Sequence, residues 1–245
     1  MIHDSTKPAF INITRQNVSY YFSQFLKSSY LLLAVSLIFY AYSKDVLIIY
    51  AKYFGIFNIR NIPGMLFFSM YSLLWLGILP IAFNKWIRRE TLYDIGIALP
   101  NNRLLAILLI IVALSLLIPF MIFFATQNTF QSYAFGGLST FQFIFIITFL
   151  FPLYYIGEEC FIRGFLFLGL WKRVGWHSFW ITDILFTLFH IGKPIPEVLL
   201  CIPASVIFNC LTLFTRSVIP AIIVHSTMGA VLSILVTYHW LGHTV

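Results

Sequence analysis

Long apolar runs constrain this chain more than any other feature. Residues 63–84, 104–125, 140–171 and 217–239 carry very few charged side chains. About 20 apolar residues in helical form are needed to cross the hydrocarbon core of a bilayer. Only 9% of the 245 residues are charged and 60% are hydrophobic, whereas soluble domains carry about 25% charged residues. The runs therefore predict an all-α fold, a polytopic transmembrane helical bundle embedded in the lipid bilayer.

The pattern predicts seven spans in one integral membrane domain that covers residues 1–245. The predicted spans are 28–43, 63–84, 104–125, 140–171, 176–192, 196–214 and 217–239. Segment 44–62 is too short and too charged to be predicted as a span, which favours an interfacial or re-entrant helix. The count becomes eight if this segment crosses the membrane.

The basic residues lie in loops between the apolar runs. The formal charge of +7 comes from 15 Lys and Arg against 8 Asp and Glu. The loops at 85–103, 172–173 and 216 are basic, while the loop at 126–139 has no charge. Alternating spans place the basic loops on one side, which the positive-inside rule makes cytoplasmic. The charge therefore indicates orientation in a membrane, and no nucleic-acid partner is expected.

One charged cluster, at residues 157–164, interrupts the longest apolar run. Charged groups at this depth are expensive and persist only where they pair, face a wet cavity or do chemistry. Glu159 and Arg163 are four residues apart in the favourable order, so we expect an ion pair. Glu158 is rotated by about 100° from its neighbour. It is the carboxylate left free, and we predict that it acts as a general base.

Two histidines are expected to reach the depth of this carboxylate. Glu158 lies 13 residues before Trp171, and His190 lies 14 residues after Trp176 on the next helix. Both positions are about 20 Å from the same membrane surface. His225 follows the last basic loop by nine residues, which is about 13 Å of helix. The three side chains are therefore predicted to converge.

Asp183 provides a further expected contact. Its depth matches that of Arg163, so we hypothesise that the two side chains pair. Each member of the cluster also has a structural interpretation: Glu159 with Arg163 as helix glue, and each histidine as a helix–helix hydrogen bonder. An unpaired Glu158 in hydrocarbon has no comparable structural explanation.

The same residues carry a family resemblance. Residues 158–163 read EExxxR and are followed by Gly-Phe-Leu, residues 186–190 read FxxxH, and His225 lies in a later apolar run. This order and membrane setting resemble the CAAX protease and bacteriocin-processing family, also called the Abi family. The likeness covers about residues 140–235, and the loop at 92–97 is also similar to a segment of that family.

The resemblance implies a glutamate-type intramembrane endopeptidase whose catalytic helix core spans residues 140–239. In that family the residue matching Glu158 activates water for attack on a peptide carbonyl. His190 matches the histidine that positions the water, and His225 matches the histidine that stabilises the oxyanion. Glu159 and Arg163 match the supporting ion pair.

The chain departs from the family pattern at one position. The family usually has Asn or Asp four residues after the later histidine, and here that position is Gly229. A side-chain donor to the oxyanion is therefore missing. Asn209 and Ser226 are candidate substitutes, and Asn209 joins Asp183 among the expected supporting residues.

Several alternatives stay open at this point. Two histidines and a carboxylate also form a catalytic zinc set, but the HExxH spacing is missing. The expected enzyme thus needs no metal or cofactor, with zinc as the minor alternative. Its expected substrate is a membrane-associated protein or peptide precursor, and its expected location is the bacterial inner (cytoplasmic) membrane.

Two other classes of function compete with proteolysis. The first is a non-proteolytic immunity or binding protein of the same family, which Gly229 favours. The second is a small transporter with Glu158, Asp183 and the histidines as a proton relay. The lack of a repeated half counts against a transporter.

Overall fold

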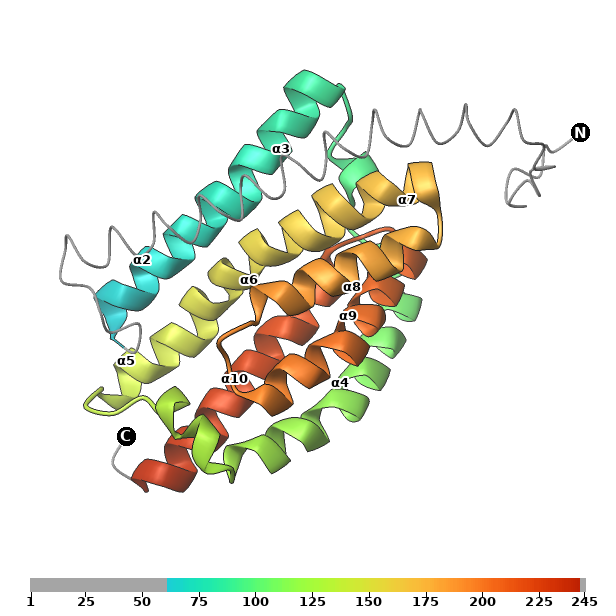
Figure 1. Cartoon of the computed structure of the whole chain (residues 1–245). Coiled ribbons are helices and arrows are strands. Elements are labelled where there is room, and N and C mark those ends of the chain that lie inside the picture. Colours follow the sequence, from blue (N-terminus) through green and yellow to red (C-terminus); the bar gives the residue numbers. More distant parts are fainter. Residues whose placement is uncertain (1–60, 243–245) are drawn as a thin grey trace, which may run out of the picture.

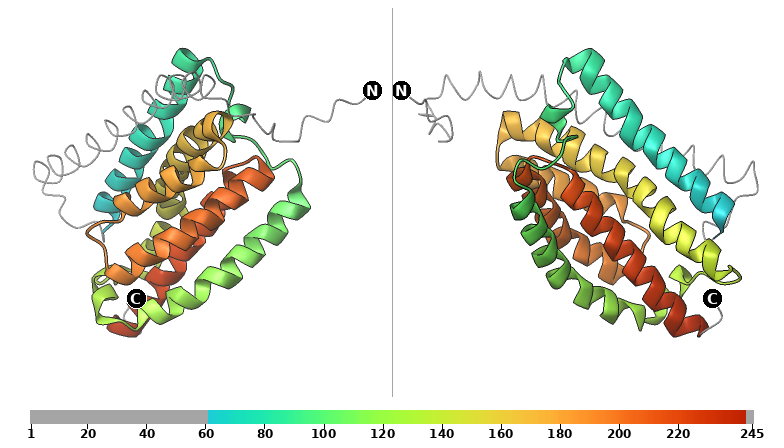
Figure 2. Two further views of the ribbon diagram at one scale, coloured as in Figure 1. Left: turned by 45° about the vertical axis from the view of Figure 1, so that its right-hand side comes forward. Right: turned by 180° about the vertical axis from the view of Figure 1, so that it is seen from behind.

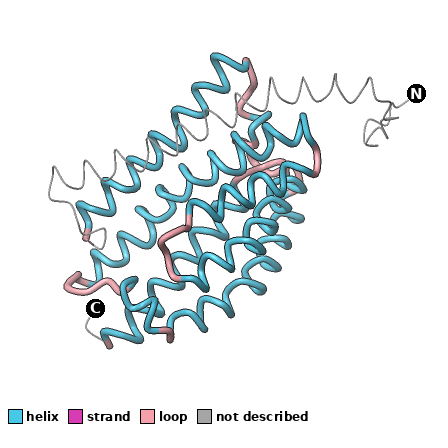
Figure 3. The backbone as a smooth tube through the Cα atoms, in the orientation of Figure 1, coloured by secondary structure: helices cyan, strands magenta, loops and turns pink. Residues whose placement is uncertain are grey.

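The computed structural model describes residues 61–242, and every regular element in this part is a helix (Figure 3). The helices form one bundle (Figure 1). The predicted all-α fold is therefore confirmed for the described residues. The predicted span at 28–43 and nearly all of segment 44–62 lie outside this part.

Five helices of this part are long and apolar enough to cross a membrane: Ile62–Trp86, Arg103–Ala125, Thr140–Val174, Ile195–Thr215 and Ile219–Leu241. The first contains α2 (Ile62–Ser72) and α3 (Leu79–Phe83), and the third contains α5 (Thr140–Phe145), α6 (Phe151–Glu159) and α7 (Gly169–Val174). The others are α4 (Arg103–Ala125), α9 (Ile195–Thr215) and α10 (Ile219–Leu241). Each of the five coincides with a predicted span.

The helix expected at 176–192 is shorter than predicted. It is α8 (His177–Phe189), with 13 residues, which is about 20 Å of helix. Gly175 precedes it with φ +54°, and Gly192 follows it with φ +98°, both in the left-handed region that glycine tolerates. Because α8 is not one of the five long helices, a count of seven or eight spans stays a prediction.

The second half of the helix Thr140–Val174 lies inside the bundle, where every residue from Gly157 to Leu170 is buried. In Figures 1 and 2 the α2–α3 rod lies on one side of it and α4 lies on the far side of the molecule. Helix α6 packs against α2 and α10, while α9 packs against α8, α4 and α10. A π-helical stretch, Cys160–Leu168, begins directly after the two glutamates, and such wide turns occur often at functional sites.

Small residues allow α2 to approach α6 closely. The Ser69 hydroxyl donates to the carbonyl of Leu150 at 2.8 Å, and the Ser72 hydroxyl donates to the carbonyl of Tyr154 at 2.8 Å. A Cβ on Gly157 would collide with the Ser72 backbone. In lipid the hydrophobic effect does not drive helices together, so close backbone packing and interhelical hydrogen bonds stabilise their association. This contact fixes the helix that carries the glutamates.

The loop at 92–97 ties the same helix to the start of α10. A Cβ on Gly164 would lie 2.7 Å from the Ile95 carbonyl oxygen. The Val218 N–H donates to the Gly96 carbonyl at 3.0 Å, and the Ser217 hydroxyl donates to the Ala98 carbonyl at 2.6 Å. The loop therefore joins the helix of Glu158 to the helix of His225.

We predict that Gly164→Ala destabilises the protein by about 1–3 kcal/mol, because the added methyl group overpacks this contact. The measurement is thermal unfolding of purified protein in detergent. Gly136→Ala is the matched control, since its Cβ would meet only a flexible Leu241 methyl at 3.4 Å. Equal melting temperatures for the two variants would show that the loop does not pack on the helix as described.

The loop also carries an exposed ion pair. Lys172 donates to Asp94 at 2.8 Å, and the hydroxyl and N–H of Thr91 donate to the same carboxylate. The hydrogen bonds from Lys172, and then those from Thr91, hold the pKa of Asp94 well below its usual range. Because 38% of its side chain is exposed, the pair contributes less than about 1 kcal/mol.

A carboxylate with a lowered pKa stabilises the fold above its ordinary pKa of about 4, and this contribution disappears as pH falls toward its folded value. We therefore expect Asp94→Asn to lower the melting temperature slightly at pH 7. The difference from wild type should shrink as the pH drops below about 4. A difference that stays constant over this range would argue against the Lys172 contact.

Candidate active site

The two adjacent glutamates end α6 and are buried. Glu158 is 4% exposed, while Glu159 and Arg163 are fully buried. The predicted contact between Glu159 and Arg163 is present, with Arg163 Nε 3.2 Å from Glu159 Oε2. Taking these charges out of water costs several kcal/mol per ion unless each finds partners. Neighbouring side chains of the site supply those partners.

His225, from α10, contacts both carboxylates. Its Nδ1 lies 2.7 Å from Glu159 Oε1 and 3.9 Å from Glu158 Oε2. An ionised carboxylate only accepts hydrogen bonds, so we assign a proton to Nδ1 that is donated to Glu159. In the neutral ring, Nε2 then carries the lone pair. The sequence predicted that Glu159 pairs with Arg163. It did not predict that Glu159 also orients His225.

His190 follows the last residue of α8 and is held by its own helix. Its Nδ1 lies 2.8 Å from the carbonyl oxygen of Phe186. A carbonyl only accepts hydrogen bonds, so Nδ1 again carries the proton and Nε2 carries the lone pair. The Phe186 ring centroid is 4.6 Å from that of His190 and 5.8 Å from that of His225. The FxxxH spacing therefore supplies both the carbonyl that orients His190 and the ring between the histidines.

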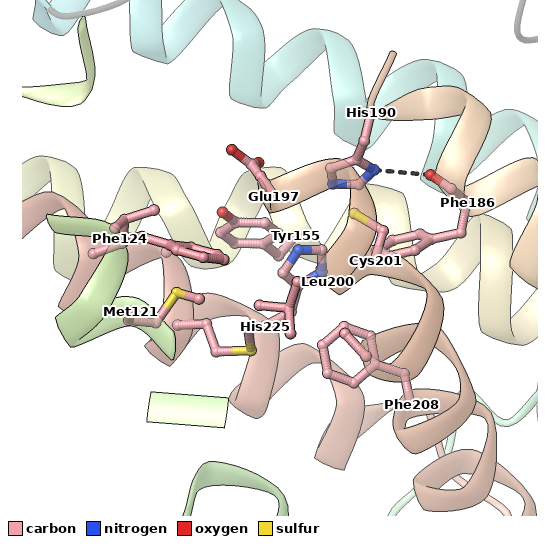
Figure 4. Close-up of a pocket in the computed structure, with 14 residues that line it drawn as sticks. Met121, Phe124, Tyr155, Phe186, His190, Glu197, Leu200, Cys201, Phe208 and His225 are labelled. Atoms are coloured by element: carbon pink, nitrogen blue, oxygen red, sulfur yellow. Dashed lines mark hydrogen bonds between the residues drawn. The ribbon is translucent and has the colours of Figure 1, made fainter. Parts of the chain in front are cut away.

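The two histidines line a cavity of about 70 Å³ (Figure 4). Apolar side chains from α4, α9 and α10 form most of the rest of its wall. A second cavity of about 170 Å³ shares Tyr155, Glu197 and Gly229 with the first. Among the described residues that line either cavity, Glu158 does not appear. The structure thus places Glu158 beside His225 rather than in the open cavity.

The predicted direct pair between Asp183 and Arg163 is wrong, because Asn209 lies between the two side chains. Arg163 Nη1 donates to Asn209 Oδ1 at 3.2 Å, and Asn209 Nδ2 donates to Asp183 Oδ1 at 3.0 Å. An amide both accepts and donates, so it can bridge a cation and a carboxylate. Asn209 is committed to this network, and neither Asn209 nor Ser226 is among the described residues that line the cavity.

Tyr155 fills the space next to Gly229. A Cβ at position 229 would collide with the Tyr155 hydroxyl, so a larger residue fits there only if Tyr155 moves. The ring centroids of Tyr155 and His225 are 4.1 Å apart. Sequence reasoning missed Tyr155, although its place about one helical turn before Glu158 was a usable signal.

The described residues provide no ready-made metal site. In residues 61–242, no group of three or more His, Cys, Asp and Glu side chains is arranged to hold a metal ion. The expectation of a metal-free and cofactor-free site stays a prediction, and zinc stays the alternative to test.

A comparison with known protein families found a match to the part of the chain that contains this site. Residues 137–231 match the Rce1-like family, which is described as type II CAAX prenyl endopeptidase Rce1-like. This segment, less than half of the chain, is similar to that family, and together with the five long apolar helices it supports an integral membrane protein. The recognition of the CAAX protease family is thereby confirmed, and the Rce1-like segment contains both glutamates and both histidines of the site. Searches of curated proteins and of solved structures found no match.

We predict that Asn209→Ala destabilises the protein by about 1–3 kcal/mol, because it removes buried hydrogen bonds to Arg163 Nη1 and Asp183 Oδ1. Thermal unfolding in detergent measures the effect. Asn101→Ala removes the same amide from an exposed loop and should change stability by less than about 0.5 kcal/mol. A similar small change for both variants would contradict the bridging role of Asn209.

Proposed function

We propose that the chain is an intramembrane endopeptidase of the CAAX type, in which a glutamate activates water to hydrolyse a peptide bond. One observation carries the proposal: two histidines of an Rce1-like segment line one cavity with their Nδ1 atoms directed to other acceptors, and Glu158 Oε2 lies 3.9 Å from one of them, His225. The Glu159 carboxylate is occupied by Arg163 at 3.2 Å and His225 at 2.7 Å. Glu158 has neither contact at hydrogen-bond distance and is the carboxylate available as a base.

The proposed reaction starts with a water that donates one hydrogen bond to the Nε2 lone pair of one of the two histidines and directs its other proton toward Glu158. Glu158 takes a proton from this water as general base. The water oxygen bonds to the carbonyl carbon, and the π electron pair moves onto the carbonyl oxygen. When that pair returns, the C–N bond breaks, and the proton passes from Glu158 to the leaving nitrogen. The products are a carboxylic acid and an amine.

The surroundings of the site support a membrane-associated substrate. The cavity lies among helices that are long and apolar enough to cross a bilayer, and its walls are mostly apolar. Excluding bulk water strengthens the electrostatic interactions inside a site. We propose a membrane-associated protein or peptide precursor as substrate and the bacterial inner membrane as location.

The test compares the N- and C-termini of membrane proteins by mass spectrometry in cells that carry wild type or Glu158→Gln. New termini should form with wild type and disappear with Glu158→Gln, because the amide cannot act as the base. Asp94→Asn is the matched control: it makes the same acid-to-amide change in an exposed loop and should retain the termini. All three proteins are compared at equal folded yield.

A chelator-treated arm separates the mechanisms. Termini that survive the chelator fit a metal-free glutamate mechanism, whereas their loss would move the mechanism to zinc. Identical termini with wild type and Glu158→Gln would contradict proteolysis and favour the binding-protein alternative.

A further inference from the structure

The cavity offers many acceptors and few donors to a substrate. The Nδ1 protons of His225 and His190 are directed to Glu159 and to the Phe186 carbonyl, at 2.7 Å and 2.8 Å. In their neutral forms both rings therefore present a lone pair at Nε2. Glu197 is a further acceptor, held by Lys193 at 3.0 Å and by Tyr133 at 2.6 Å.

Hydrolysis of an amide requires a donor as well. Negative charge develops on the carbonyl oxygen, and a preorganised hydrogen bond to it is one of the largest catalytic effects. Among the described residues that line the cavity, only Tyr155 and Cys201 add a side-chain proton to those of the histidines. A thiol is a weak donor, whereas a phenol is a good one.

The Tyr155 side chain lies in the wall of the cavity beside His225 and Gly229. Its ring packs on His225 with centroids 4.1 Å apart, and its hydroxyl lies over Gly229. Figure 4 shows Tyr155 between Glu197 and His225 in the wall of the cavity. Both cavities are lined by Tyr155 and Gly229, so a peptide that ran from one cavity to the other would contact the Tyr155 side chain.

We propose that Tyr155 is a catalytic residue whose hydroxyl donates a hydrogen bond to the oxyanion formed from the scissile carbonyl. The inference rests on the proposed function, because it adds a residue to that site. As the C–O bond to water forms, the carbonyl oxygen gains the π electron pair and accepts the Tyr155 hydrogen bond. Tyr155 keeps its proton throughout, and the bond weakens when the C–N bond breaks and the carbonyl reforms.

Gly229 is part of the same arrangement, because it makes room for the Tyr155 hydroxyl. Since any Cβ at this position would collide with the hydroxyl, the missing side chain is what leaves room for Tyr155. A residue with a donor at position 229 and the tyrosine at position 155 are therefore mutually exclusive solutions to one chemical requirement.

The main experiment measures how fast the Glu158-dependent termini form in isolated membranes that contain equal amounts of folded protein. Tyr155→Phe removes one donor and retains the ring against His225, so the rate should fall about 100-fold or more. Tyr238→Phe removes the same atom from an exposed side chain of α10 and should leave the rate within about twofold. A wild-type rate for Tyr155→Phe would overturn the role of Tyr155 and leave the proposed function intact. If the wild type forms no Glu158-dependent termini, both proposals are overturned.

If Tyr155→Phe lowers the folded yield, moving the hydrogen-bond donor from position 155 to position 229 tests the role of Tyr155. Tyr155→Ala and Gly229→Asn should each be slow, because one lacks the donor and the other displaces it. The double variant Tyr155→Ala/Gly229→Asn places an amide donor in the vacated space. It should cleave at least about tenfold faster than Tyr155→Ala, and a rate no faster than Tyr155→Ala would overturn the proposal.

Discussion

The site depends on one fully buried carboxylate, Glu159, which is shared by Arg163 and His225. A buried ion pair is tolerated only when its remaining hydrogen-bonding groups are also satisfied. Arg163 Nη1 donates to both Ser205 and Asn209 on α9. The charge requirement of a single residue therefore connects α6, α9 and α10 and fixes the orientation of the histidine that faces the cavity.

The backbone makes this arrangement possible through close contacts. Gly157 admits the α2 backbone and Gly164 admits the loop carbonyl of Ile95, one on each side of the charged cluster in sequence. Both contacts place small residues where helices and loops meet, as expected in lipid. Stability and chemistry thus share one helix, and its neighbouring glutamates divide the roles: Glu159 holds the histidine, and Glu158 is proposed to act on water.

Much of the fold was predictable, because hydrocarbon imposes length and polarity on each span. The same reasoning predicted that Glu158 and His225 lie near each other, because polar groups buried in the membrane need partners at a similar depth. It failed for Asp183, because matching depths do not reveal that an amide such as Asn209 lies between two side chains. It also missed Tyr155, whose ring looks like ordinary packing in sequence and is distinguished only by the empty position at Gly229. The span count depends on residues 1–60 and on the short α8.

The division of roles between the two glutamates is the central claim, and comparing the melting temperatures of Glu158→Gln and Glu159→Gln in detergent tests it most directly. Glu159→Gln removes the charge shared by Arg163 and His225, so it should cost about 3–5 kcal/mol. Glu158→Gln should remain close to wild type, because within residues 61–242 its carboxylate forms no ion pair at hydrogen-bond distance and lies 3.9 Å from His225 Nδ1. Equal destabilisation by the two substitutions would contradict the claim and make Glu158 a second structural charge.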